Sequence, residues 1–447
     1  MAWVTLRAIS LSKIAAVGVT ACVAIATTTA CSTGQHGDHA EELARPTVDA
    51  AAAAPEGQHH AAAVQPPGAV DLRAQLEQLL GQHAILTVRL TRARLRGDAD
   101  LAQSADAALS KNAADIAALI AAVDGAEAGE TFEQAWFNHV TYLFNYARGV
   151  ADDDAAVTSE ARSQLDAYVI DLSEYLAEAT NGKLSAEVVG KELRMHVDQL
   201  LEQVDAYAAE DYERAFQLER ESYAHMFPLG KALAAGIVTG EGGQLPKEFG
   251  SPSTELQSQL GMKFGEHAEL AVDAMRSGIS GLADFPAAAG ALDQNTRELT
   301  AIVESVFGAE GARAFQALWA DHIDAFVEYT QALAKQDEAA EDAAKSRLTQ
   351  FNDDFASFLS TSTQGRLGTA ALADAFVMHE DMLLQQINAY AEADYSTAYE
   401  VSYEAYQHMF ALAEQAATAI GETVTARGPK RGPNTGGGGM AATIAGR

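Results

Sequence analysis

The chain has 447 residues, and 62 acidic residues against 30 Lys and Arg residues give it a formal net charge of -32. This charge would repel phosphate backbones and anionic lipid surfaces, so the sequence argues against a nucleic-acid function. Aromatic residues make up only 7% of the chain and prolines number 10, which favours helix over sheet.

The first thirty residues have the features of an export signal. They contain Arg7 and Lys13, no acidic residue, and an apolar run that ends in small residues. The stretch TTAC, ending at Cys31, resembles the lipobox of bacterial lipoproteins, and this resemblance implies that Cys31 is lipidated as the first mature residue. The alternative stretch VTAC, ending at Cys22, fits the first lipobox position better but lies early in the apolar run.

We therefore expect an exported protein that a lipid anchor holds on the extracytoplasmic face of the cell membrane. A plain cleaved signal peptide, followed by secretion, is the alternative. Cys22 and Cys31 are the only cysteines, so the sequence predicts no disulfide framework. Residues 31–70 are rich in Ala, Gly, Pro and Gln and should form a flexible tether, and residues 422–447 should form a disordered tail.

An internal repeat lies between the tether and the tail. The stretch MHVDQLLEQVDAYAAEDYERAF, from Met195, matches MHEDMLLQQINAYAEADYSTAY, from Met378, at an offset of 183 residues. FEQAWFNHVTYLFNY matches FQALWADHIDAFVEY at the same offset, and GQHAILTV matches GEHAELAV at an offset of 184. The repeat predicts two copies of one module, residues 71–237 and 254–421, joined by a linker over residues 238–253.

Each module has the pattern of helices separated by polar turns, without the alternation and hairpin turns of strands. In the first module we predict helices over residues 72–96, 99–123, 131–150, 155–178, 185–208 and 211–236. The sequence therefore predicts an all-α fold of two tandem antiparallel helical bundles. Each bundle should contain about six helices arranged as three helical hairpins.

The histidines follow the repeat without exception. Four of the twelve lie in the tether, and the others form two matched sets of four. These sets are His83, His139, His196 and His225 in the first module, and His267, His322, His379 and His408 in the second. Apolar neighbours at spacings of three and four place each imidazole on the inward stripe of its helix. Counted from the helix ends, the four of each module lie at about one level, which predicts a four-histidine cluster.

A shared metal ion would satisfy several buried imidazole acceptors at once. The Glu-x-x-His pairs of di-iron bundles are missing, and methionine accompanies histidine instead. Those methionines are Met195, Met226, Met378 and Met409. Imidazole with thioether in an oxidising compartment favours copper, with zinc next. Ordinary core packing is the alternative role for these methionines, because adjacent residues are turned by about 100° on a helix.

We therefore expect a metal-binding protein, best suited to copper, that captures, stores or transfers the ion through a four-histidine site in each module. The first alternative is a lipoprotein that binds haem non-covalently or transfers electrons, since no c-type attachment motif is present. The second is a metal-free helical interaction module whose histidines serve the core or sense pH. The sequence contains no motif for a Ser or Cys nucleophile, a phosphate-binding loop or an HExxH zinc site, so we predict no enzyme.

The two modules resemble a repeat of secreted and surface proteins of Gram-positive bacteria. The similar segments are EHAELA, a Trp three residues before a His, MH, AYAEADY and HMF. Some of those proteins carry a copper amine oxidase label through other domains. Copper amine oxidases form their quinone cofactor from a tyrosine in Asn-Tyr-Asp/Glu, whereas the nearest text here is NYA at Asn145 to Ala147, without a His-x-His copper pair. This departure argues against oxidase activity.

Overall fold

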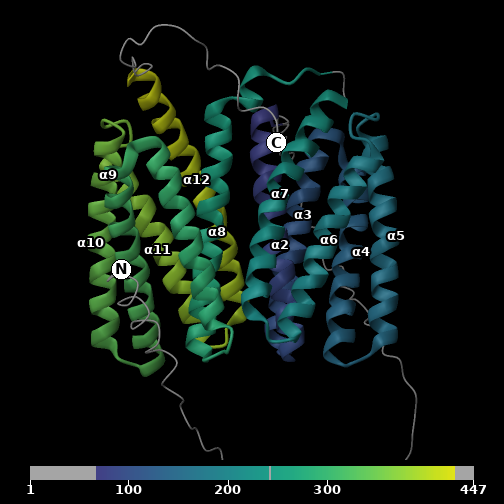
Figure 1. Cartoon of the computed structure of the whole chain (residues 1–447), viewed down its shortest axis with the longest axis horizontal. Helices are drawn as coiled ribbons and strands as arrows, with labels where there is room; N and C mark the ends of the chain where they lie inside the picture. Colours follow the sequence, from purple (N-terminus) through teal and green to yellow (C-terminus); the bar gives the residue numbers. More distant parts are fainter. Residues whose placement is uncertain (1–66, 241–242, 428–447) are drawn as a thin grey trace, which may run out of the picture. The chain divides into compact units, whose positions relative to one another are not determined.

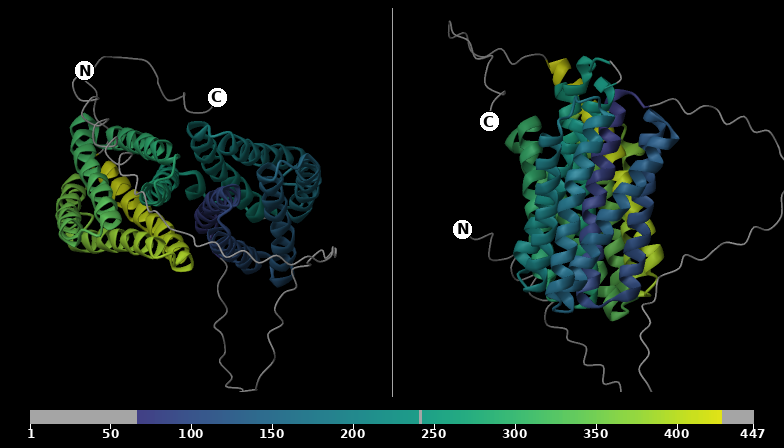
Figure 2. Two further views of the ribbon diagram at one scale, coloured as in Figure 1. Left: turned by 90° about the horizontal axis from the view of Figure 1, so that it is seen from below. Right: turned by 90° about the vertical axis from the view of Figure 1, so that its right-hand side faces the viewer.

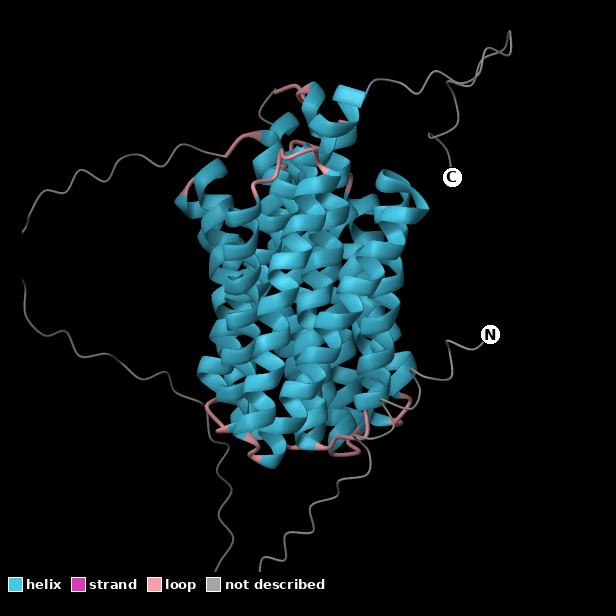
Figure 3. Ribbon diagram, turned by 90° about the vertical axis from the view of Figure 1, so that its left-hand side faces the viewer, coloured by secondary structure: helices cyan, strands magenta, loops and turns pink. Residues whose placement is uncertain are grey.

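The computed structural model describes residues 67–240 and 243–427. The predicted signal peptide, Cys31, most of the tether and most of the tail lie outside these residues. The described part consists of eleven α-helices and one short 3-10 helix, with no strand among its elements. Figure 3 shows these helices joined by short loops. The predicted all-α fold is therefore confirmed.

The first module contains six helices whose bounds lie within a few residues of the prediction. They are α2 (Ala69–Arg96), α3 (Ala99–Asp124), α4 (Ala126–Ala151), α5 (Ala155–Ala179), α6 (Ala186–Ala208) and α7 (Tyr212–Gly240) (Figure 1). Local capping explains this agreement. The side chains of Asp98 and Ser185 accept hydrogen bonds from the Leu101 and Val188 amides, at 3.4 and 3.2 Å, and so fix where α3 and α6 begin.

The second module repeats this order after a short 3-10 helix, η2 (Lys247–Gly250). Its helices are α8 (Pro252–Ser280), α9 (Phe285–Lys335), α10 (Glu338–Ser362), α11 (Thr369–Ala391) and α12 (Tyr395–Arg427). α9 is two helices joined at Gly308, whose φ of 77° is a backbone conformation that glycine adopts readily. The second module thus also has six helical segments, and α12 continues past the predicted module end at residue 421.

Each module closes on itself. Consecutive helices pack on each other, and the first helix of each module also packs on the last, α2 on α7 and α8 on α12. In Figure 2 the helices of each module run alongside one another. Inward side chains on neighbouring helices can therefore meet at a common level, as the histidine positions require.

α2 and α8 are the most deeply buried helices. Residues of both modules belong to one compact unit, and α2 packs on its own bundle with one face and on α8 and α12 with another. Gly81 and Gly265 allow the close approach. A Cβ atom at Gly81 would lie 2.7 Å from the Tyr406 hydroxyl, and one at Gly265 would lie 2.7 Å from the Tyr406 ring. Alanine at either position would force these helices apart.

Candidate metal centres

In the first module, two histidines from different helices face each other directly. His83 on α2 and His139 on α4 place their Nε2 atoms 3.0 Å apart, and their ring centroids are 4.9 Å apart. Both side chains are buried, with exposed fractions of 0% and 1%. Each ring is on the inward stripe of its helix, as predicted, so the histidine positions bring two ring nitrogens together in the core.

A third histidine completes the group. The ring of His196 on α6 lies 6.0 Å from that of His83, centroid to centroid. Its Nδ1 is 3.4 Å from the Ser222 hydroxyl, and its Nε2 is buried without a hydrogen-bond partner. We call His83, His139 and His196 the first histidine centre.

The fourth histidine of the module makes a different contact. The Nε2 of His225 on α7 is 3.0 Å from the backbone carbonyl oxygen of Glu192, four residues before His196 on α6. In the structure this ring therefore hydrogen-bonds to the main chain, not to another imidazole. The sequence predicts that His225 joins the other three histidines at one ion; in this structure its Nε2 contacts the Glu192 carbonyl oxygen.

The second module repeats this arrangement, except that the contact of His196 with Ser222 has no counterpart, since Ala405 replaces the serine and neither nitrogen of His379 has a partner. The Nε2 atoms of His267 and His322 are 3.3 Å apart, and the His379 ring lies 6.3 Å from that of His267. The fourth residue, His408, again has its Nε2 close to a backbone carbonyl, at 2.9 Å from the Ala375 oxygen. We call His267, His322 and His379 the second histidine centre. Two copies with different surroundings have kept the same geometry.

Aromatic rings hold the paired imidazoles in place. Trp136 lies 4.7 Å from His83, and Tyr168 stacks on His139 at 4.8 Å with an interplanar angle of 18°. In the second centre Trp319 lies 4.6 Å from His267, and a phenylalanine, Phe351, stacks on His322 at 4.5 Å. The rings are thus fixed before any ligand arrives, which lowers the entropy that binding must overcome.

Burial keeps these imidazoles neutral. It lowers the pKa of His139 to about 4 and that of His322 to about 3. The Trp136 carbonyl opposes the shift at His139, although its geometry with Nδ1 is too poor for a hydrogen bond. Burial and the neighbouring histidines also lower the pKa of His83 well below its usual value. Neutral imidazoles carry the free lone pair that a metal ion needs.

The spacing of the rings suits ligands that share one ion. With metal–nitrogen bonds of about 2.0 to 2.1 Å, Nε2 atoms 3.0 and 3.3 Å apart subtend an angle of about 91 to 111° at the metal. Imidazoles on a common ion have centroids about 5 to 6 Å apart, close to the separations seen here. Among residues 67–240 and 243–427, however, no three His, Cys, Asp or Glu side chains are already in position to hold a metal. A third ligand would have to come from a small movement of His196 or His379.

The four predicted methionines divide into two kinds. Met226 and Met409 are buried in the cores of their modules, beside His225 and His408 in sequence. Met195 and Met378 are 40% and 55% exposed, on the outer faces of α6 and α11. Met195 and Met378 are therefore surface residues next to a buried histidine, since adjacent residues on a helix point about 100° apart.

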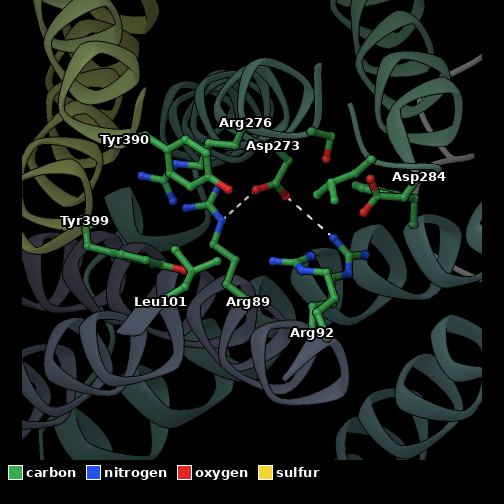
Figure 4. Close-up of a pocket in the computed structure, with 12 residues that line it drawn as sticks. Arg89, Arg92, Leu101, Asp273, Arg276, Asp284, Tyr390 and Tyr399 are labelled. Atoms are coloured by element: carbon green, nitrogen blue, oxygen red, sulfur yellow. Dashed lines mark hydrogen bonds and ion pairs between the residues drawn. The ribbon is translucent and has the colours of Figure 1, made fainter. Parts of the chain in front are cut away.

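The sequence analysis did not predict a second cluster of buried polar groups, which lies where the two modules meet. Arg89 of α2 forms ion pairs with Asp273, at 2.7 Å, and with Glu269, both on α8. Arg92 pairs with Glu219 at 2.8 Å. Figure 4 shows Arg89 and Arg92 converging on Asp273. We call these five residues the junction network.

Equivalent residues of the two modules build the walls around this network. Arg92 lies over the Phe216 ring at 4.0 Å, and its counterpart Arg276 lies over the Tyr399 ring at 4.6 Å. The cavity between these residues is about 30 Å³, enough for one or two water molecules. Burial opposes the ionisation of Asp273, but its arginine neighbours outweigh burial and lower its pKa. The junction network thus pairs its charges internally and has no room for a substrate.

Comparisons with known proteins give no match: no family model, no curated protein and no solved structure is similar to this chain. In the described part of the chain, no helix is long and apolar enough to span a membrane. The chemistry of the histidine centres is therefore the guide to function.

Proposed function

We propose that this protein binds one metal ion in each histidine centre, and that copper in its monovalent state fits best. The observation that carries the proposal is the close approach of two buried Nε2 atoms, made twice in one chain. One such pair could be a simple N–H···N hydrogen bond. Both pairs have a third histidine at the same relative position, so each centre takes its three histidines from three helices. A common ligand explains this repeated arrangement better.

The charge of the site favours a monovalent ion. The donors of both centres are neutral imidazoles, and no carboxylate belongs to either set of three. A buried divalent ion would need an anionic ligand to balance its charge, as the desolvation of an uncompensated charge is costly. Cu(I) carries one charge and accepts imidazole, but two-coordinate Cu(I) is close to linear, so the Nε2 spacing here requires His196 or His379 as a third ligand. Zinc is the second choice, because it also accepts imidazole.

Binding of haem is less well supported by the geometry. Two histidines on opposite faces of a haem have their ligating nitrogens about 4 Å apart, twice a metal–imidazole bond of about 2.0 Å. The paired Nε2 atoms here are 3.0 and 3.3 Å apart, and aromatic rings stack directly on the same imidazoles. A haem would require the helices to separate.

The biological role that we propose is capture, storage or transfer of metal outside the cytoplasm. The leader sequence and the lipobox-like TTAC support export and anchoring through Cys31 on the outer face of the cell membrane. A deeply buried centre with two or three donors suits holding an ion more than turning over a substrate, because substrate access is restricted.

The test is a count of ions in matched variants. Mature protein would be loaded with Cu(I) under reducing conditions, and separately with Zn²⁺, desalted, and measured by elemental analysis. We expect two copper ions per chain for the unmodified protein and one each for His139→Leu and His322→Leu. The double variant should bind none. Thermal unfolding of each variant without metal shows whether it is folded.

Two results would contradict the proposal. One is an unmodified protein that keeps no copper or zinc after desalting. The other is a folded double variant that keeps as much metal as the unmodified chain. An intense visible absorption band after exposure to haem, lost in the double variant, would instead support the haem alternative.

A further inference from the structure

We infer that His225 and His408, together with the exposed Met195 and Met378, form the route by which the ion reaches each buried histidine centre. This inference rests on the proposed function and assigns separate roles to residues that the sequence grouped together. The inner histidines hold the ion, and the outer histidine and methionine pass it inward.

The exposed fraction falls from the outer residues to the inner ones, as a route requires. In the first module the exposed fraction falls from 40% at Met195 through 8% at His225 and 4% at His196 to 0% at His83. The second module has the same order, since Met378 is 55% exposed, His408 is partly exposed and His267 is 1% exposed. His225 and His408 each lie against the helix of the inner histidine, since their Nε2 atoms contact the carbonyl oxygens of Glu192 and Ala375, four residues before His196 and His379.

The tautomer of the outer histidine is fixed in a form that can bind metal. A carbonyl oxygen only accepts hydrogen bonds, so the Nε2 of His225 must carry the hydrogen that it donates to Glu192. The lone pair of the neutral ring is then on Nδ1. His408 has the same bond to the Ala375 carbonyl and therefore the same tautomer. Such a bond on the far nitrogen is how metal-binding imidazoles are commonly oriented.

The helix that His225 contacts, α6, carries an anionic group and a soft group one turn apart. Met195 lies three residues after Glu192 on α6, so the thioether and the carboxylate are neighbours on one helix face. The Glu192 carboxylate is 3.8 Å from the His225 ring. In the second module Ala375 replaces the glutamate, while the methionine is kept as Met378. The thioether is thus the surface group that both modules share. A thioether binds Cu(I) in preference to the harder metal ions of the medium.

The experiment measures the rate of loading. Trp136 and Trp319 lie 4.7 and 4.6 Å from a histidine of each centre, so quenching of their fluorescence should report arrival of the ion. Mature full-length protein would be mixed with excess Cu(I) under reducing conditions in a stopped-flow instrument. The variants are His225→Gln with His408→Gln, and Met195→Leu with Met378→Leu. Gln keeps a donor for the carbonyl but removes the imidazole.

We expect the histidine pair of changes to slow loading about tenfold and the methionine pair about threefold, with two ions bound at the end in each case. Val188→Leu, an exposed residue on α6, is the matched control and should load at the unmodified rate. Loading of both paired variants at the unmodified rate would overturn the inference and leave the proposed function standing. So would a loss of bound ions without a change in rate, because the outer residues would then belong to the centre itself. If the unmodified protein takes up no ion, the proposed function fails first.

Discussion

The histidine centres and the junction network are both clusters of polar groups buried on α2 and α8, yet they are satisfied in opposite ways. The junction network pairs each buried arginine with carboxylates of the other helices, although some of its atoms, such as Arg92 Nε and Glu219 Oε1, also have no hydrogen-bond partner. The first histidine centre leaves the Nδ1 atoms of His83 and His139 and the Nε2 atom of His196 without partners. A buried polar atom without a partner weakens a fold by about 1 to 3 kcal/mol. We take the junction network to serve stability, and we propose that the centres serve a ligand.

The largest difference should appear on the acid side of neutral pH. Burial lowers the pKa of His139 to about 4 and, with neighbouring histidines, that of His379 to about 3, whereas an unfolded histidine titrates near 6.5. Below pH 6.5 these histidines are therefore protonated in the unfolded chain but remain neutral in the folded chain. The free energy of unfolding should fall by about 1.4 kcal/mol per pH unit for each such histidine, down to its folded pKa.

Denaturant unfolding of the metal-free protein from pH 7 to pH 4 would measure this loss. Because His139→Leu with His322→Leu removes two of the titrating groups, its curve should be less steep. Equal slopes for the variant and the unmodified protein would show that these histidines are not the source of acid sensitivity. Bound Cu(I) should delay the loss to lower pH, since the ion competes with protons for the same lone pairs.

The next largest effect should come from breaking the junction network. Arg89→Met leaves Glu269 buried without its ion-pair partner and Asp273 with only the longer pair to Arg92, at 3.8 Å, and should lower the free energy of unfolding by about 3 to 5 kcal/mol. Arg94→Met, on the same helix, removes a more exposed pair with Asp152 and should lower it by less than about 1 kcal/mol. Urea unfolding at pH 7 distinguishes the two. Equal losses would mean that the junction network does not stabilise the packing of the modules.

These two regions also differ in how far sequence could predict them. The helices and the inward histidines were predictable because apolar spacing, polar turns and a repeat kept in both copies are local signals. Arg89 and Asp273 occupy equivalent positions in the two copies but carry opposite charges, and the ion pair exists because these positions meet where α2 packs on α8. A search for what the copies share overlooks a pair that depends on their difference. Opposite charges at matching positions within buried stretches were the available signal.

The hydrogen-bond partners within the histidine centres could not be predicted from the sequence for a similar reason. The spacing of His225 predicts that it lies on the inward stripe at the level of His196, and in the structure it contacts α6 one turn from that residue. Which nitrogen it presents, and to what, depends on the Glu192 carbonyl of the neighbouring helix. Main-chain partners across a helix pair depend on the rotation of the two helices, which side-chain patterns constrain only loosely.

The smallest effect, and the most discriminating, is expected for the inner histidines without metal. His139→Leu removes an imidazole whose Nδ1 has no partner and fills most of its space with an apolar side chain. Removing an unsatisfied Nδ1 offsets the lost stacking on Tyr168, but the change also leaves the His83 Nε2 without its partner at 3.0 Å, so we expect the free energy of unfolding at pH 7 to fall by about 1 to 2 kcal/mol. Excess Cu(I) at about one hundred times its dissociation constant should stabilise the unmodified protein by about 2.7 kcal/mol for each of its two centres. The variant keeps one centre, so it should gain only about 2.7 kcal/mol in total. A loss of 3 kcal/mol or more in the metal-free variant would place His139 with the junction residues, as a structural member of the core.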